Sequence, residues 1–395
     1  MTVPPEIPAL ELPALDAAQR EQLAASSAAL QALLDARGGW LAFDEYLQQV
    51  MYAPGLGYYS AGAAKFGAAG DFVTAPEIST LFGACVARQC APLLGADAVL
   101  LELGAGSGAL AETLLHRLAA LEALPQQYLI LEVSAELRAR QQARLAALPV
   151  NLRSRLQWLN ALPVRPVRGV ILANEVADAL PFQCFSAAGG EFFERGVCRD
   201  AAGALQWAQR PAAPVLAAEL RCIAATLPHG FAPGYRSELC RRLDPWLAAL
   251  AAVLDTGLLL LFDYGLGRSE LYHPQRDAGT LRCHYRHRAH DDPFLYPGLQ
   301  DITAWVDFTR VAEAASAAGL EVAGYCTQAA FLLASGIELE LAAASDGVVR
   351  ARLAAQARAL LMPGEMGETF KVMALTRGPQ QALAGFALQD LRRLL

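Results

Sequence analysis

The sequence has few of the features that mark membrane, exported or nucleic-acid-binding proteins. Its apolar runs, such as residues 257–262, are far shorter than the roughly 20 residues that span a bilayer. Residues 1–15 contain acids and prolines but no basic residue, unlike a secretory signal or a transit peptide. The formal net charge of -7 gives no general attraction to nucleic acid or to an anionic membrane. We therefore expect a cytoplasmic protein with no membrane insertion and no nucleic-acid partner.

Cysteine pairs at metal-ligand spacing are also missing. None of the eight cysteines forms a Cys-x-x-Cys pair, so neither a zinc ribbon nor a dithiol redox centre has support. We expect buried, reduced thiols and no metal site. What is present is apolar: 54% of the residues are hydrophobic and only 18% are charged, which is ample for a packed core. A chain of 395 residues predicts one large domain with insertions, or two domains.

Short apolar segments alternate with segments of helical composition along most of the chain. This alternation is typical of a parallel α/β sheet that is covered by helices on both faces. The predicted strands are residues 99–103, 128–131, 169–173, 257–262, 320–326 and 370–376. The first four end in polar residues on their carboxyl side, where open α/β sheets bind ligands. A ligand site is therefore expected at that edge.

A glycine-rich turn follows the first of these strands. Gly104, Gly106 and Gly108 permit positive φ and let ligand atoms approach the backbone before a helix opens at residue 109. The spacing differs from the Gly-x-Gly-x-x-Gly of dinucleotide-binding proteins and lacks the Gly-Lys-Ser/Thr of a phosphate loop. Glu102 is placed to contact an ammonium group of the cofactor. Glu132 closes the next strand and is placed to accept hydrogen bonds from ribose hydroxyls. Together, the strand, the glycine turn, the helix and the acid at the end of the next strand predict a nucleotide-type cofactor.

Two further features favour S-adenosylmethionine as that cofactor. The glycine spacing is of the methyltransferase kind, and Asn174, Glu175 and Asp178 follow the strand where class I methyltransferases place substrate and catalytic groups. The strands at 320–326 and 370–376 supply a sixth strand and an antiparallel seventh. We predict a Rossmann-like class I methyltransferase fold with a seven-stranded sheet.

The predicted organisation has two parts. Residues 1–92 form an N-terminal helical cap and a cofactor-covering segment, and residues 93–395 form the Rossmann-like domain. Two stretches interrupt the alternation of strands and helices in this domain. Residues 182–255 are predicted to be an insertion of a hairpin and helices, and residues 265–301 a long, functional or mobile loop.

Several stretches resemble the MidA family, which includes the mitochondrial arginine methyltransferase needed for complex I assembly. They run in order along the chain and comprise residues 70–79, 102–108, 173–175, 178–181, 263–265, 286–288, 301–308 and 366–372. The resemblance implies a class I methyltransferase with an N-terminal helical cap. It also implies an arginine of a partner protein, a respiratory complex I subunit, as the substrate. Val176 and Ala177 depart from the family pattern, which commonly has two aromatic residues there.

The candidate site residues divide into catalytic and cofactor-binding groups. Glu175 and Asp178 are predicted to orient the acceptor, since carboxylates fix the plane of a guanidinium. His287 is a candidate proton acceptor. The predicted cofactor-binding residues are Phe72, Thr74, Glu102, Gly104, Gly106, Gly108, Glu132 and Asn174.

Three other functions remain open at this point. The same cofactor site serves small-molecule O- or C-methyltransferases, since a fold does not determine its substrate. A non-catalytic assembly factor could retain the fold and bind a partner protein. NAD-dependent oxidoreduction is a minor alternative.

Overall fold

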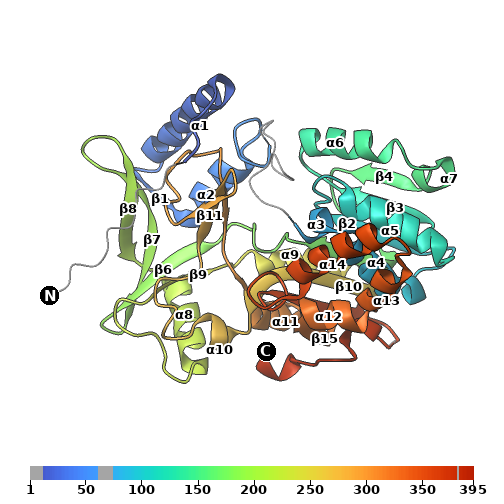
Figure 1. Ribbon diagram of the computed structural model, residues 1–395. Coiled ribbons are helices and arrows are strands. Elements are labelled where there is room, and N and C mark those ends of the chain that lie inside the picture. The colour runs from blue at the N-terminus through green and yellow to red at the C-terminus, as the bar shows by residue number, and fades with distance from the viewer. Residues whose placement is uncertain (1–11, 61–73, 380–381) are drawn as a thin grey trace.

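The computed structural model describes residues 12–60, 74–379 and 382–395, which form two lobes (Figure 1). One lobe is built around a large sheet with helices on both faces. The other, which we call the cap lobe, combines residues 12–60, 182–240 and 268–304 around two smaller sheets. Within the described residues, no helix has the length and apolarity needed to cross a bilayer.

The large sheet confirms the predicted class I fold. Its strand order is β15-β16-β10-β5-β2-β3-β4, and every strand is parallel to the rest except β16, which is antiparallel to both neighbours. The strands are β2 (Val99–Leu103), β3 (Gln127–Leu131), β4 (Leu156–Leu159), β5 (Val167–Asn174), β10 (Leu254–Leu266), β15 (Glu321–Thr327) and β16 (Phe370–Arg377). A short strand, β14 (Val306–Asp307), extends the sheet along the end of β10. The strand β4 was not predicted from the sequence, because it is a short edge strand whose side chains are only partly buried.

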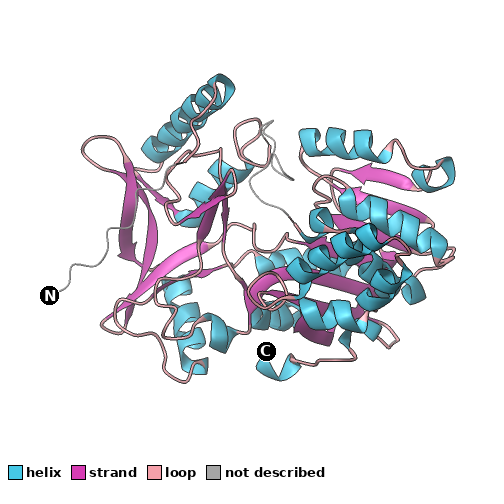
Figure 2. Cartoon of the chain, viewed as in Figure 1, coloured by secondary structure: helices cyan, strands magenta, loops and turns pink. Residues whose placement is uncertain are grey.

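Helices cover both faces of this sheet (Figure 2). Because the central strands are buried on both sides, their side chains are apolar almost without interruption. One face packs against α4 (Thr80–Cys90), α5 (Ala109–Ala120), α12 (Gln328–Ala334), α13 (Ile337–Ala343) and α14 (Gly347–Leu361). The other face packs against α9 (Leu243–Val253) and α11 (Phe308–Ala317). This three-layer arrangement leaves the carboxyl ends of the strands open at one edge.

The cap lobe contains strands as well as helices. This differs from the helical cap that the sequence predicts for residues 1–92. Between α1 (Ala17–Ala36) and α2 (Phe43–Tyr52), the short strand β1 (Trp40–Ala42) pairs with β7 of the insertion. The second sheet has the order β1-β7-β6-β9, with β8 on β7. Its other strands are β6 (Gln183–Ala188), β7 (Glu191–Arg199), β8 (Leu205–Pro211) and β9 (Arg236–Leu239), and α8 (Pro214–Thr226) packs against it. The insertion contains the predicted hairpin, β7–β8, and α8, and residues 236–239 add a strand that the sequence did not predict.

Residues 265–301 also differ from the prediction of a long loop. They include α10 (Arg268–Leu271), β11 (Arg282–Tyr285) and β12 (Arg288–His290), and a third strand, β13 (Asp301–Thr303), pairs with β11. Cys283 and Ile302 are buried in the same core as α1 and α2. The sequence analysis missed these strands because each is short and contains polar residues.

Candidate active site

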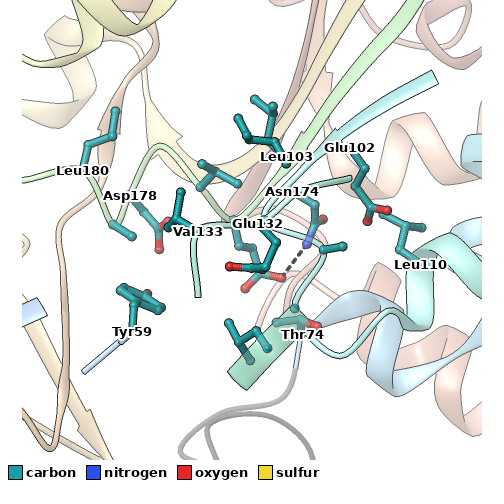
Figure 3. A pocket seen from close by; sticks show the side chains of 18 of the residues that line it. Tyr59, Thr74, Glu102, Leu103, Leu110, Glu132, Val133, Asn174, Asp178 and Leu180 are labelled. Carbon is teal, nitrogen blue, oxygen red and sulfur yellow. Dashed lines mark hydrogen bonds between the residues drawn. The ribbon is translucent and has the colours of Figure 1, made fainter. Parts of the chain in front are cut away.

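A cavity of about 440 Å³ lies at the carboxyl ends of the parallel strands, between the large sheet and the cap lobe (Figure 3). It extends along the glycine turn to Glu132 and continues to Asp178 and Asp301. Its walls therefore come from both lobes. The predicted site residues that line it are Thr74, Glu102, Gly104, Gly106, Glu132, Asn174, Glu175 and Asp178.

The glycine turn leaves this end of the cavity open. Gly104 and Gly106 have φ values of 59° and 54°, and Gly108, at 85°, precedes α5 in the left-handed region. The backbone N–H of Gly104 donates to the Leu131 carbonyl at 3.0 Å, which ties the turn to the end of β3. The nearest atom to a Cβ placed on Gly104 is Val176 Cγ2, at 3.5 Å. Because Gly104 and Gly106 carry no side chain, the space beside their backbone stays free for a ligand.

Glu132 is held at the end of β3 by hydrogen bonds on both carboxylate oxygens. The Ser134 N–H donates to Oε1 at 2.8 Å, and Gln141 Nε2 on α6 (Ala135–Leu145) donates to Oε2 at 2.9 Å. The same Gln141 nitrogen donates to the Gly106 carbonyl at 3.0 Å. Glu132 is 5% exposed. The acid predicted to bind the ribose is thus fixed in position relative to the glycine turn.

Glu102, the last acid before the turn, is buried in β2. The Tyr128 hydroxyl donates to Glu102 Oε2 at 2.7 Å. Burial, and to a lesser extent the negative charge of Glu132, raises the pKa of Glu102 to about 7. A cationic group beside Glu102 would favour its ionised form, which is the environment predicted for the cofactor's ammonium.

Glu175 follows β5 in a backbone conformation that residues other than glycine rarely adopt. Its φ is 55°, and its N–H donates to the Phe262 carbonyl at 2.9 Å. Its carboxylate accepts from Asn174 Nδ2 at 3.1 Å (Figure 3) and from the Tyr264 hydroxyl at 3.4 Å. Burial and the negative charge of Asp178 raise the pKa of Glu175 to about 8. A non-glycine residue held at positive φ costs about 1 kcal/mol or more, and such residues cluster at functional sites.

Asp178 lies beyond Glu175 in the same cavity and is 3% exposed. Burial, together with the negative charges of Asp263 and Asp301, raises the pKa of Asp178 well above its ordinary value. Within the described residues, Asp178 Oδ1 has no hydrogen-bond partner. A buried acceptor without a partner costs free energy, so this atom favours a donor brought by a ligand.

Asp263, by contrast, has a positioning role behind the cavity wall. Its Oδ2 accepts the N–H groups of Ala177 and Asp178 at 2.9 and 3.2 Å. Burial and the charge of Glu175 raise its pKa to about 8. Asp263 therefore holds the turn that presents Asp178 to the cavity.

The wall that precedes α4 is only partly described. Thr74 is buried and lines the cavity immediately before α3 (Ala75–Ile78). Glu77 of α3 accepts a hydrogen bond from Ser107, so α3 contacts the glycine turn. Phe72, also predicted to bind the cofactor, lies outside the described residues.

His287 does not lie with the other predicted catalytic residues. It is exposed, with φ of 60°, in the two-residue turn between β11 and β12. It does not line the described cavity. A proton acceptor must reach the acceptor group directly or through one water, so the described structure gives no support to His287 in that role, which stays a prediction.

Sequence reasoning missed the contribution of the cap lobe. Tyr52 at the end of α2, Tyr59 in the following turn and Asp301 line the cavity from the cap lobe, and Arg242, at the start of α9, lines it beside them. Asp301 stands in one of the family-like stretches, but the sequence gives no sign that it approaches Asp178. The sequence gives no sign that the two tyrosines reach the site.

These residues fit S-adenosylmethionine, which supplies an electrophilic methyl group on a sulfonium. The open glycine turn suits close approach of the methionine portion. Glu102 suits its ammonium, and Glu132 has carboxylate oxygens for the ribose hydroxyls. The cavity reaches all three features.

Comparison with known proteins decides the family. Residues 85–326, more than half of the chain, match the model of the family described as "Putative S-adenosyl-L-methionine-dependent methyltransferase". The chain belongs to this family. A crystal structure of a superfamily member from Burkholderia thailandensis, bound to S-adenosyl-homocysteine, is 44% identical. It has a TM-score of 0.92 and covers 97% of this chain and 100% of that one. The chain is an S-adenosylmethionine-dependent methyltransferase, and NAD-dependent oxidoreduction loses its support.

Curated relatives resemble the methyltransferase over most of its length. The zebrafish (Danio rerio) protein named "Protein arginine methyltransferase NDUFAF7, mitochondrial" is 28% identical, over 85% of this chain and 83% of the relative. The Homo sapiens protein of the same name is also 28% identical, over 86% of this chain and 80% of the relative. The resemblance stated from the sequence is confirmed.

Proposed function

We propose that this methyltransferase transfers a methyl group to an arginine side chain of a partner protein. The observation that carries the proposal is the unpartnered Asp178 Oδ1, which lines the cavity together with Glu175 and Asp301. Among the described lining residues, Arg242 is the single basic one. A guanidinium is cationic at any physiological pH and donates several N–H groups, so it suits such a site.

The carboxylates have two tasks in this reaction. A guanidinium nitrogen attacks the methyl carbon, the carbon–sulfur bond breaks, and its electron pair stays on the sulfur. The nitrogen also loses a proton, so the methylated product keeps a single positive charge. Glu175 and Asp178 are placed to orient the guanidinium, and a carboxylate in contact with it is placed to receive the proton. Their raised pKa values suit a proton acceptor near neutral pH.

The printed names of the curated relatives support arginine as the acceptor. The partner we propose is a respiratory complex I subunit, on the resemblance to the MidA family. The cytoplasmic location stays a prediction, and those relatives are named as mitochondrial. All eight cysteines are free thiols in the structure, with Cys222 exposed. Fractionation of the source cells would test the location directly.

The test is label transfer with the full-length protein. Purified protein, S-adenosylmethionine labelled on the methyl group and native lysate from cells that lack the protein are mixed. We expect label in a protein band and in methylarginine after acid hydrolysis. Glu175→Gln should bind S-adenosylhomocysteine normally and transfer no label. Label in a small molecule contradicts the proposal and favours an O- or C-methyltransferase. Normal cofactor binding with no acceptor in any fraction favours the assembly-factor reading.

A further inference from the structure

The acceptor end of the cavity has two walls that come from different lobes. Glu175 and Asp178 belong to the turn after β5 of the large sheet. Tyr52, Tyr59 and Asp301 belong to the cap lobe and line the same cavity. Figure 3 shows Tyr59 close to Asp178 at this end, away from Glu102.

Both tyrosine hydroxyls are occupied by hydrogen bonds within the protein, while the residues line the cavity. The Tyr52 hydroxyl donates to the Ala179 carbonyl at 2.6 Å, and the Tyr59 hydroxyl donates to Asp301 Oδ1 at 3.0 Å. The rings stack on each other with centroids 5.4 Å apart and an angle of 29°. Both residues remain partly exposed although they lie among buried neighbours. Aromatic faces next to carboxylates bind a flat cation well.

We propose that Tyr52, Tyr59 and Asp301 form a wall that selects a guanidinium over an ammonium as the methyl acceptor. The planar cation packs against the Tyr59 ring, which Tyr52 supports by stacking, and its N–H groups reach Asp178 Oδ1 and Asp301. This inference rests on the proposed arginine methylation and assigns the selectivity to the cap lobe.

The preference for a guanidinium has a physical basis. Guanidinium is planar, weakly hydrated and presents a fixed fork of donors, so stacking and two carboxylate contacts are satisfied together. An ammonium is a compact, strongly hydrated point charge, which loses more hydration here and gains less from a ring face. The unpartnered, nine-tenths buried Asp178 Oδ1 is the independent sign that this acidic cluster meets a donor.

The test separates acceptor recognition from cofactor binding. Three ligands carry adenosine joined at its 5′ position, through the same linker, to an alkylguanidine, an alkylamine or an uncharged alkylurea. Their affinities for the full-length protein are measured by calorimetry, beside that of S-adenosylhomocysteine. We expect the guanidine ligand to bind about tenfold more tightly than the urea ligand and several-fold more tightly than the amine ligand.

Variants of the cap wall should remove the preference and spare the cofactor. Asp301→Asn and Tyr59→Leu should bring the guanidine and amine ligands to within about twofold of each other, with unchanged affinity for S-adenosylhomocysteine. Tyr59→Phe keeps the ring and loses only the hydrogen bond to Asp301, so its preference should be intermediate. Asp255→Asn removes an exposed charge outside the cavity lining and is the matched control. If Asp301→Asn does not fold, the two Tyr59 variants carry the test.

Two results would contradict the proposal that the cap wall selects a guanidinium. One is equal affinity of the wild-type protein for the guanidine and amine ligands; the other is an undiminished preference in Asp301→Asn or in Tyr59→Leu. Either result, with lysate label still found in methylarginine, removes the wall and leaves the proposed function standing. Label on another acceptor removes the proposed function itself.

Discussion

Gln141 and Glu132 are joined by a hydrogen bond of 2.9 Å, and this bond helps to fix the position of the acid that we predict to bind the ribose. The amide of Gln141 cannot turn freely, because Trp158 Nε1 donates to its Oε1 at 2.9 Å. Its Nε2 also reaches the Gly106 carbonyl, so one buried side chain connects β3, β4 and the glycine turn. The cofactor site therefore depends on a residue that is not expected to contact the cofactor.

Gln141→Ala should weaken cofactor binding through the loss of this arrangement. Glu132 would lose one of its fixed donors and gain freedom to turn. We expect the Kd of S-adenosylhomocysteine, measured by calorimetry, to rise about tenfold, which corresponds to one hydrogen bond to a charged group. The exposed neighbour Gln142→Ala is the matched control and should bind as the wild type does. Equal affinity of both variants would contradict the positioning role of Gln141.

Glu132→Ala should have a larger effect than the loss of its partner. It removes the carboxylate that lines the cavity, and we expect the Kd to rise about 100-fold or more. Cells that carry only this variant should lose the methylation found in the lysate assay. If their complex I still assembles normally without that methylation, the protein acts there as a non-catalytic factor.

Glu175→Gln should separate cofactor binding from catalysis. The amide keeps the size of the side chain but neither compensates a cationic acceptor nor takes up its proton. We expect methyl transfer to fall about 100-fold or more, with affinity for S-adenosylhomocysteine within about twofold of the wild type. Unchanged transfer in a radiolabel assay would refute the proposed role of Glu175.

The stability of the cofactor-free protein should fall as the pH rises from about 5 to 8. The folded protein holds the pKa of Glu102 at about 7 and those of Glu175 and Asp263 at about 8. In the unfolded chain these carboxyls lose their protons near pH 4, so the folded state binds more protons across this window. The free energy of unfolding therefore decreases with pH until the folded-state pKa values are passed.

Melting temperature measured at half-unit steps of pH checks this prediction. Glu175→Gln removes one of the titrating groups, so its profile should be flatter than that of the wild type below about pH 8. Parallel profiles for the two proteins would show that Glu175 is ionised in the folded state at neutral pH.

The large sheet and the cofactor end of the site could be predicted from the sequence, because both depend on local patterns. An apolar strand, a glycine turn and an acid at the next strand end follow each other within residues 99–132. Glu175 and Asp178 of the acceptor end could also be predicted, but Tyr59 and Asp301 could not, because they are far apart along the chain and come together only in the fold. The short strands β1, β9 and β11 leave no clear alternation, so the sequence predicts helices, a single hairpin and a loop for the cap lobe.

His287 shows the limit of reading function from residue type alone. A histidine in a polar stretch suggested a base, but the residues around it form a tight hairpin. Arg286 and His287 both adopt positive φ there, as a two-residue turn between twisted strands requires.

The cap lobe is assembled from separate segments, and the described chain passes between the lobes near residues 181, 241, 267 and 305. A domain appended at one end of a protein swings on a single tether. Here any widening of the cavity must bend all of these connections together. If a partner protein's side chain enters this cavity, as we propose, the two lobes should therefore move apart as a concerted hinge at all of these connections.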